Sequence, residues 1–100
     1  MSGLPAGGLV AFVKRDCPTC VLVAPVLAEL ARDGAIVVSQ DDPGFPAGIA
    51  GVRHDDSLEL SFRAGIEIVP TLVRYASGRE VARIYGWNRA EWQAFTGRPV

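Results

Sequence analysis

The sequence predicts an α/β fold in which a mixed four-stranded sheet carries helices on both faces. Three observations lead to this prediction. A strand-helix-strand pattern occupies residues 9–39, two β-rich runs joined by a short link occupy residues 71–85, and helix-cap patterns introduce two further segments. The expected order is therefore β-α-β-α-β-β-α, which lets 100 residues enclose one apolar layer as a single domain over residues 1–100.

The first part of the chain has the pattern of a strand, a helix and a second strand. Residues 9–13 (LVAFV) and 35–39 (AIVVS) are unbroken apolar runs, as expected for parallel strands covered on both faces. Between them, apolar residues recur with helical spacing and predict a helix over residues 18–32. Pro18 suits the first turn, whereas Pro25 lies in the interior, where a proline costs about 3 kcal/mol. A right-handed crossover makes the two strands parallel.

The second part of the chain predicts a loop, a short helix, a hairpin and a last helix. Residues 40–55 begin with an acidic strand exit, QDD, and hold prolines and glycines without a sustained period, which is typical of an irregular connection. Residues 56–64 open with DSLE, which resembles a capping box, and predict a short helix. Residues 71–75 and 80–85 predict an antiparallel hairpin. Residues 88–91 (NRAE) form a second capping box before the last helix.

Composition and charge exclude several classes of function. With 49% hydrophobic residues the chain is too apolar for disorder, yet no apolar stretch approaches the ~20 residues that span a bilayer, so we expect no membrane partner. Ten basic and eleven acidic residues give a net charge of −1, which does not favour nucleic acid as a partner. Residues 1–8 show no secretory signal, so the cytoplasm is the expected location. We expect a monomer.

The most informative motif is Cys17-Pro18-Thr19-Cys20, two cysteines three positions apart at the start of the predicted long helix. This spacing places their Cα atoms within the roughly 4.4 to 6.8 Å that a disulfide requires. The helix N-terminus favours a thiolate at Cys17, the expected nucleophile, and the deeper apolar position of Cys20 makes it the expected resolving thiol. Thiol–disulfide exchange through such a pair needs no metal or organic cofactor.

Other interpretations of these residues stay open. A zinc site needs about four ligands, and only Cys17, Cys20 and His54 are good candidates in this sequence. The cysteines are also consistent with two small buried hydrophobic residues, although their place at a helix start argues against it. His54 is expected to be a solvated imidazole. Trp87 is either a contact surface for a bound peptide or a cover for the edge of the core.

Two stretches, FVKRDCPTCVLVAPVLAEL and IVPTLVRYASGREVARIYG, resemble the thioredoxin family, and the resemblance covers residues 9–95. Its motifs are specific in combination: the C-x-x-C, Pro25, the run Val69-Pro70-Thr71, and Gly86 at the end of the last strand. The resemblance implies a thioredoxin-like fold with the active-site helix kinked at Pro25. It also implies a cis peptide bond between Val69 and Pro70, packed against Cys17.

The same resemblance implies a thiol–disulfide oxidoreductase whose redox-active disulfide, Cys17 with Cys20, takes the place of a cofactor. Its partners would be a disulfide-containing protein substrate and an unidentified thiol or disulfide redox partner. The implied substrate-binding residues are Pro18, Thr19, Val69, Pro70, Thr71, Gly86 and Trp87.

This sequence departs from the family pattern around the cysteines. Thioredoxins usually carry a buried acid six residues before the nucleophile, where this chain has Ala11, and a tryptophan where it has Asp16. Proline directly after the first cysteine is similar to glutaredoxins instead. These departures predict slower resolution of mixed disulfides and a narrower partner range. A binding or adaptor module that uses the cysteine pair, or a redox domain of a longer enzyme, remain the alternatives to an independent oxidoreductase.

Overall fold

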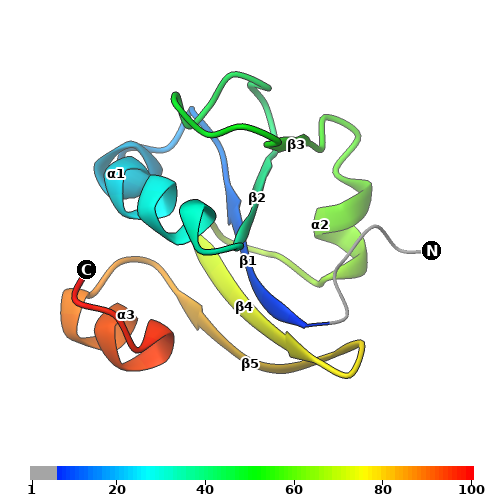
Figure 1. The fold of residues 1–100 in the computed structure, drawn as a ribbon. Coiled ribbons are helices and arrows are strands. Elements are labelled where there is room, and N and C mark those ends of the chain that lie inside the picture. The colour runs from blue at the N-terminus through cyan, green and yellow to red at the C-terminus, as the bar shows by residue number, and fades with distance from the viewer. Residues whose placement is uncertain (1–6) are drawn as a thin grey trace.

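The computed structural model describes residues 7–100. Residues 1–6, part of the segment in which we expect no secretory signal, lie outside the described residues. None of the helices in the described part is long and apolar enough to cross a membrane. Figure 1 shows the arrangement of the elements. They are β1 (Gly8–Val13), α1 (Pro18–Arg32), β2 (Ile36–Ser39), β3 (Arg53–His54), α2 (Glu59–Arg63), β4 (Thr71–Ala76), β5 (Arg79–Tyr85) and α3 (Arg89–Thr96).

The strands form one mixed sheet in the order β3-β2-β1-β4-β5. β1 pairs in parallel with β2, and β4 pairs antiparallel with both β1 and β5. The hairpin turns at Ser77 and Gly78, whose φ angles of 54° and 76° are the left-handed pair that a tight two-residue turn requires. The central strand β1 is thus paired on both sides, which places its carboxyl end, and the loop to α1, in the middle of the sheet edge.

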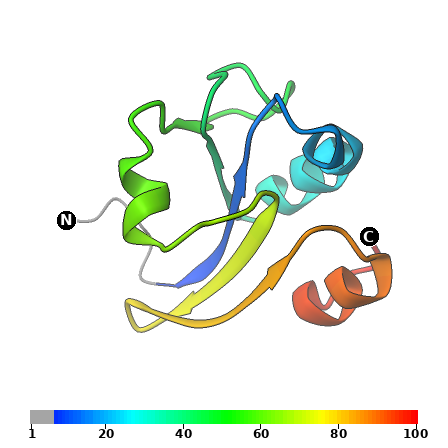
Figure 2. The same cartoon turned by 180° about the vertical axis from the view of Figure 1, so that it is seen from behind.

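Helices cover both faces of the sheet, as the sequence predicts: α1 and α3 lie on one face and α2 on the other (Figures 1 and 2). The alternation of side chains along β1 produces two cores. Ala11 and Val13 belong to the cluster on the α1 side, and Val10 and Phe12 to the cluster on the α2 side. An unbroken apolar run is therefore needed at β1 because both of its faces are buried.

The sheet has five strands, so the expectation of four is corrected. Arg53 and His54, in the segment expected to be an irregular connection, form β3 and pair in parallel with Val38 and Ser39 of β2. The sequence carries no sign of this strand because it is two residues long and both of its side chains are exposed. Its pairing with β2 runs through the backbone, which imposes no hydrophobic period on the sequence.

The start of α2 also differs from the expectation. The capping-box pattern at residues 56–59 makes no side-chain cap, and Leu58, with φ 62°, is the N-cap residue. The carboxylate of Asp55 serves instead: its two oxygens accept hydrogen bonds from the backbone N–H groups of Leu60 at 3.0 Å and Ser61 at 2.9 Å. The left-handed turn at Leu58 brings Asp55 beneath the start of α2. The spacing of residues in the sequence does not reveal this arrangement.

The last helix begins as the sequence predicts. The Asn88 side chain accepts a hydrogen bond from the backbone N–H of Glu91 at 2.9 Å, which satisfies one of the free donors of the first turn. Trp92 is fully buried, and its indole N–H donates to the backbone carbonyl of Gly86 at 3.0 Å. This bond fixes α3 against the end of β5.

Candidate active site

Cys17 lies at the N-terminus of α1, where the sequence places it. It is the N-cap residue, with extended φ and ψ of −157° and 106°, and its sulfur accepts a hydrogen bond from the backbone N–H of Cys20 at 3.2 Å. Its side chain is half-buried, and both cysteines are free thiols. A backbone donor of the first helical turn therefore points at a sulfur atom that remains partly open to solvent.

Cys20 lies one turn deeper and is fully buried. Burial raises the pKa of its thiol to about 12, and the hydrogen bond to Cys17 contributes in the same direction, while the backbone and charge of Lys14 oppose the rise. Ala11 is buried in the same apolar cluster as Cys20. The position at which the family that this sequence resembles carries a buried acid is therefore apolar here. This thiol is held protonated by its surroundings at neutral pH.

The segment before β4 faces Cys17 from the other side. The Val69–Pro70 peptide bond is cis, as the resemblance implies. The Cys17 sulfur lies 3.7 Å from the Val69 carbonyl oxygen, to which its thiol donates. The backbone N–H of Gly86 donates to the Pro70 carbonyl at 2.8 Å, which brings the end of β5 alongside this loop. Two distant parts of the sequence therefore meet at the sulfur, and a third, the end of β5, is bonded to the loop beside it.

The other residues that the resemblance implies for substrate binding lie in different surroundings. Pro18 is exposed in the first turn of α1, and Thr19 is half-buried beside it. Thr71 is fully buried, and its hydroxyl donates to the Ile68 carbonyl at 2.7 Å, so its side chain supports the loop from below.

Trp87 has the second of the two roles that the sequence left open, as a cover for the edge of the core. It is half-buried and packs edge-on against Trp92, with ring centroids 5.1 Å apart at 70°. The guanidinium of Arg89 lies 5.9 Å from the centre of the Trp87 ring. The ring thus covers the edge of the core and keeps part of its surface in solvent.

Asp41 is a site residue that the sequence did not reveal, because it appeared to be part of a strand exit. Its two carboxylate oxygens accept hydrogen bonds from the backbone N–H groups of Arg15 at 2.7 Å and Asp16 at 2.9 Å. Burial raises the pKa of Asp41, but the backbone hydrogen bonds from Arg15, Asp16 and Asp42 outweigh it and hold the pKa below its usual value. The Arg15 guanidinium also pairs with Asp42 at 3.0 Å. The loop that ends at Cys17 is therefore anchored to the end of β2.

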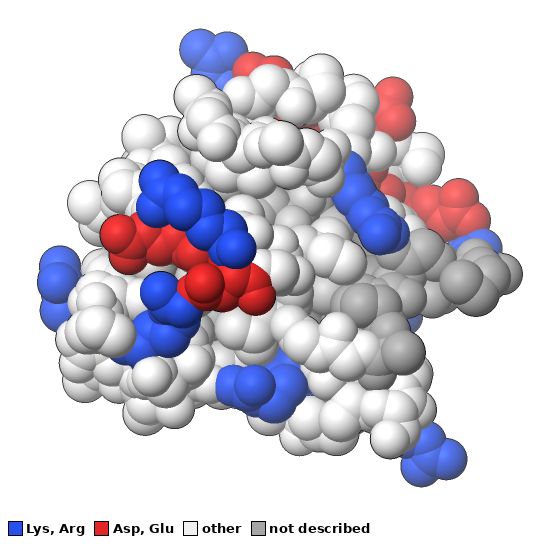
Figure 3. Space-filling view, viewed as in Figure 1, with Lys and Arg blue, Asp and Glu red and all other residues white. Residues whose placement is uncertain are grey.

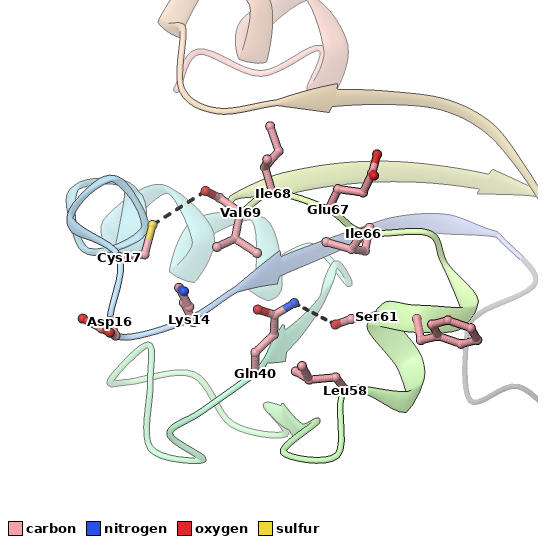
Figure 4. A pocket seen from close by; sticks show the side chains of 11 residues that line it. Lys14, Asp16, Cys17, Gln40, Leu58, Ser61, Ile66, Glu67, Ile68 and Val69 are labelled. Atoms are coloured by element: carbon pink, nitrogen blue, oxygen red, sulfur yellow. Dashed lines mark hydrogen bonds between the residues drawn. The ribbon is translucent and has the colours of Figure 1, made fainter.

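A cavity of about 580 Å³ opens beside Cys17, between the end of β1, α2 and the loop before β4 (Figure 4). Its floor is bridged by the Gln40 side-chain amide, which donates to the Ser61 hydroxyl at 2.9 Å. The lining residues are Lys14, Asp16, Cys17, Gln40, Leu58, Ser61, Phe62, Ile66, Glu67, Ile68 and Val69.

The face seen in Figure 3 carries acidic and basic side chains side by side, without a large area of one sign. Within residues 7–100, no group of three or more His, Cys, Asp or Glu side chains is placed to hold a metal ion. His54 is exposed, and its Nε2 lies 2.9 Å from the Asp41 carbonyl oxygen, outside the cysteine pair's own contacts.

The fold and the cysteine pair together define a dithiol redox protein, and comparison with known proteins makes the class more specific. No model of a protein family matches the chain. The thioredoxin of Alicyclobacillus acidocaldarius subsp. acidocaldarius is 31% identical over 83 residues, which cover 83% of this chain and 70% of that protein. The chain belongs to the thioredoxin family, and its general function is thioredoxin-type disulfide redox chemistry.

Solved structures agree on the fold. The thioredoxin of Plasmodium falciparum is similar with a TM-score of 0.67 and 17% identity, covering 96% of this chain and 84% of that chain. Chlamydomonas reinhardtii thioredoxin f2 is similar with a TM-score of 0.62 and 19% identity, covering 98% of this chain and 84% of that chain. At these identities the likeness establishes the fold alone, and the thioredoxin-like fold expected from the resemblance is confirmed.

Proposed function

We propose that this protein exchanges disulfides with protein substrates through Cys17 and Cys20, with Cys17 as the attacking and Cys20 as the resolving thiol. The observation that carries the proposal is the asymmetry of the pair. The Cys17 sulfur is partly exposed and accepts a hydrogen bond from the first turn of α1, whereas Cys20 is fully buried. Only the first sulfur is accessible to a large disulfide, and only the second is sheltered from reaction with one.

The reaction takes place in two balanced steps. The Cys17 thiolate attacks one sulfur of the substrate disulfide, forms a mixed disulfide, and releases the other substrate sulfur as a thiolate that takes a proton from solvent. Cys20 then loses its proton and attacks the Cys17 sulfur, which releases the second substrate thiolate. Two electrons have passed to the substrate, and the protein holds a Cys17–Cys20 disulfide. Its return to the dithiol form requires a thiol redox partner.

The surroundings of the cysteines assist this exchange. The Val69 carbonyl lies against Cys17, where an extended substrate segment would pair with the backbone of Val69 and Pro70. We assign Pro18, Thr19, Gly86 and Trp87 to the same substrate contact. Thr71 keeps the loop in place from within the core. Asp41 holds the peptide groups of residues 15 and 16, which lead directly to Cys17.

A turnover assay tests the proposal. Reduction of insulin disulfides with a recycling reductant should proceed with the wild-type protein and stop in the Cys17→Ser variant. The Cys20→Ser variant should instead accumulate a stable mixed disulfide, seen as a covalent adduct by mass spectrometry. Turnover that survives Cys17→Ser, or adducts that form through Cys20, would contradict the assigned roles. A redox titration of the pair then shows whether the protein acts as reductant or oxidant.

A further inference from the structure

Lys14 is a charged residue beside the cysteine pair to which no role has yet been assigned. It is the single lysine of the chain and directly follows the last residue of β1. Its side chain is half-buried and lines the cavity beside Cys17. Ala11, at the position where the thioredoxin family usually carries a buried acid, offers no charge to the resolving thiol. A cation is therefore placed near the sulfur atoms from which the acid is missing.

The backbone on both sides of Lys14 is fixed. The Val13 carbonyl accepts a hydrogen bond from the backbone N–H of Gln40 at 2.9 Å. The backbone N–H groups of the two residues after Lys14 donate to the Asp41 carboxylate at 2.7 and 2.9 Å. The Val13 side chain belongs to the cluster on the α1 side, so the alternation of side chains directs the next residue to the cavity on the other side. The charge of Lys14 is thus positioned before any reaction begins.

The positive charge of Lys14 is not used by an ion pair. Within residues 7–100, no acidic side chain forms a salt bridge with its ammonium group. The acidic residues on the cavity lining are Asp16 and Glu67, both exposed, and Figure 4 draws them at opposite ends of the cavity. The walls from β2 and α2, which include Gln40 and Ser61, add no charged side chain to this lining. The ammonium group therefore remains available to a negative charge that develops at the sulfur atoms.

The charge of Lys14 acts on Cys20. Burial raises the pKa of this thiol to about 12 and Cys17 raises it further, whereas the backbone and the charge of Lys14 lower it. In a mixed disulfide Cys17 has no thiol, so its contribution is lost, and the influence of Lys14 is then opposed by burial. A nearby cation favours the ionised form of a thiol, and its effect is screened less in a half-buried site than at the surface.

We propose that the Lys14 ammonium promotes the resolving step by stabilising the thiolate that Cys20 becomes when it loses its proton in the mixed disulfide. The proton passes to a base in solvent, the Cys20 thiolate forms a bond to the Cys17 sulfur, and the electron pair of the broken bond leaves with the substrate thiolate. Lys14 forms and breaks no bond, so it is a positioning residue that acts through Cys20. This inference rests on the proposed disulfide exchange and specifies how its second step is assisted.

A single-turnover reaction tests this role. The mixed disulfide is formed at pH 5 with an uncharged dipyridyl disulfide, which offers the ammonium no anionic group and releases one equivalent of thiopyridone. After transfer to pH 8, release of the second equivalent measures the attack of Cys20. Lys14→Met should slow this second release about tenfold, the effect of about one unit in the pKa of Cys20. Lys14→Arg keeps the positive charge and should stay within about twofold of the wild-type rate.

A matched variant and a pH profile separate the charge from a general structural effect. Arg63→Met removes a cation from α2 that already pairs with Glu59 at 2.6 Å and lies outside the cavity lining, so both releases should be unchanged. The rates of the wild type and Lys14→Met should converge at alkaline pH, where an amine loses its charge, whereas Lys14→Arg should remain faster because a guanidinium stays protonated. Asp16 and Glu67, the titratable carboxyls on the lining, are common to these proteins and do not change the comparison.

Chemical modification gives an independent check because Lys14 is the single lysine. Reductive methylation of an amine keeps its positive charge, and acetylation removes it. Each reaction is applied to the protein with the Cys17–Cys20 disulfide, which is then reduced. Acetylation should slow the second release as Lys14→Met does, and methylation should not. The Lys14→Arg protein, treated in the same way, corrects for modification of the N-terminal amine.

The two releases assign a failure to its cause. Equal slowing of both releases in Lys14→Met, a loss that Lys14→Arg does not restore, or a ratio of wild-type to Lys14→Met rates that stays constant with pH would overturn the role of Lys14. A normal first release with an unchanged second release in Lys14→Met overturns this role alone. If the wild type releases no first equivalent, or Cys17→Ser releases as much as the wild type, the proposed function itself fails.

Discussion

The resolving step should depend steeply on pH, because it requires a thiolate at a fully buried sulfur. With a pKa of about 12 for Cys20, about one thiol in 10⁵ is ionised at pH 7 and about one in 10³ at pH 9. Raising the pH from 7 to 9 should therefore accelerate the attack of Cys20 on the mixed disulfide about 100-fold. An ordinary exposed cysteine, with a pKa of about 8.5, would approach its plateau within this range.

The rate of resolution should rise with pH because the main cause of the raised pKa of Cys20 is still present in the mixed disulfide. Burial, the largest cause, persists when Cys17 is joined to a substrate, although the hydrogen bond from Cys20 to a free Cys17 sulfur is then lost. The rate should therefore continue to rise above pH 9. The same shift lowers the stability of the dithiol form from about pH 9 upward, because the folded protein retains there a proton that the unfolded chain releases.

A pH-jump experiment measures the step directly. The mixed disulfide is formed at pH 5 with a symmetrical chromophoric disulfide, which releases one equivalent of coloured thiol, and the solution is then mixed into buffers of higher pH. Resolution releases the second equivalent, and its rate is followed by absorbance. The Cys20→Ser control should release only the first. A second phase whose rate does not change with pH, or levels off below pH 9, would refute the assignment of a strongly raised pKa.

Three further changes test the architecture around the site. Ala11→Asp should accelerate resolution near pH 7 by supplying a base beside Cys20, but should lower the unfolding free energy by several kcal/mol in urea titrations, more at pH 8 than at pH 5, because burial favours the protonated carboxyl. Asp41→Ala should lower stability by about 1 to 2 kcal/mol and slow the first thiol release, since the backbone N–H groups of Arg15, Asp16 and Asp42 lose their acceptor. In the wild type this contribution should be present above the usual carboxyl pKa of about 3.9 and disappear as the pH falls through the lower folded value, and an unchanged acid titration would count against it. Trp92→Phe should cost about 2 kcal/mol in the same titrations through the lost bond to Gly86, and an unaltered midpoint would show that this bond is not needed.

The well-predicted elements are those whose sequence pattern follows from burial. β1 is apolar throughout because it is central and covered on both faces, and α1 carries its stripe because one side packs on the sheet. β3 and the start of α2 were not predictable in the same way. The former depends on backbone pairing with β2, and the latter on a left-handed turn at Leu58 that brings Asp55 beneath the helix.

At the cysteine pair, too, the local features could be predicted from sequence and the long-range contacts could not. Its spacing and its place at a helix start are local properties, so redox chemistry could be inferred from residues alone, and the order of the two thiols could be proposed from them. The cis bond at Val69–Pro70 was expected only through a family resemblance. Asp41 and the cavity beside Cys17 could not be found, because the backbone partners of Asp41 at residues 15 and 16 lie 25 or more positions away and the cavity is lined by separate parts of the chain.

The sequence by itself determined the redox chemistry and the layered α/β architecture, since both depend on short-range patterns: two thiols one helical turn apart, and runs of apolar residues with the period of a strand or a helix. Only the tertiary structure decided what surrounds the reactive sulfur. Folding brings the ends of β1, β2 and β5 and the loop before β4 to one edge of the sheet, and the contacts made there depend on distances through space that the order of residues does not encode.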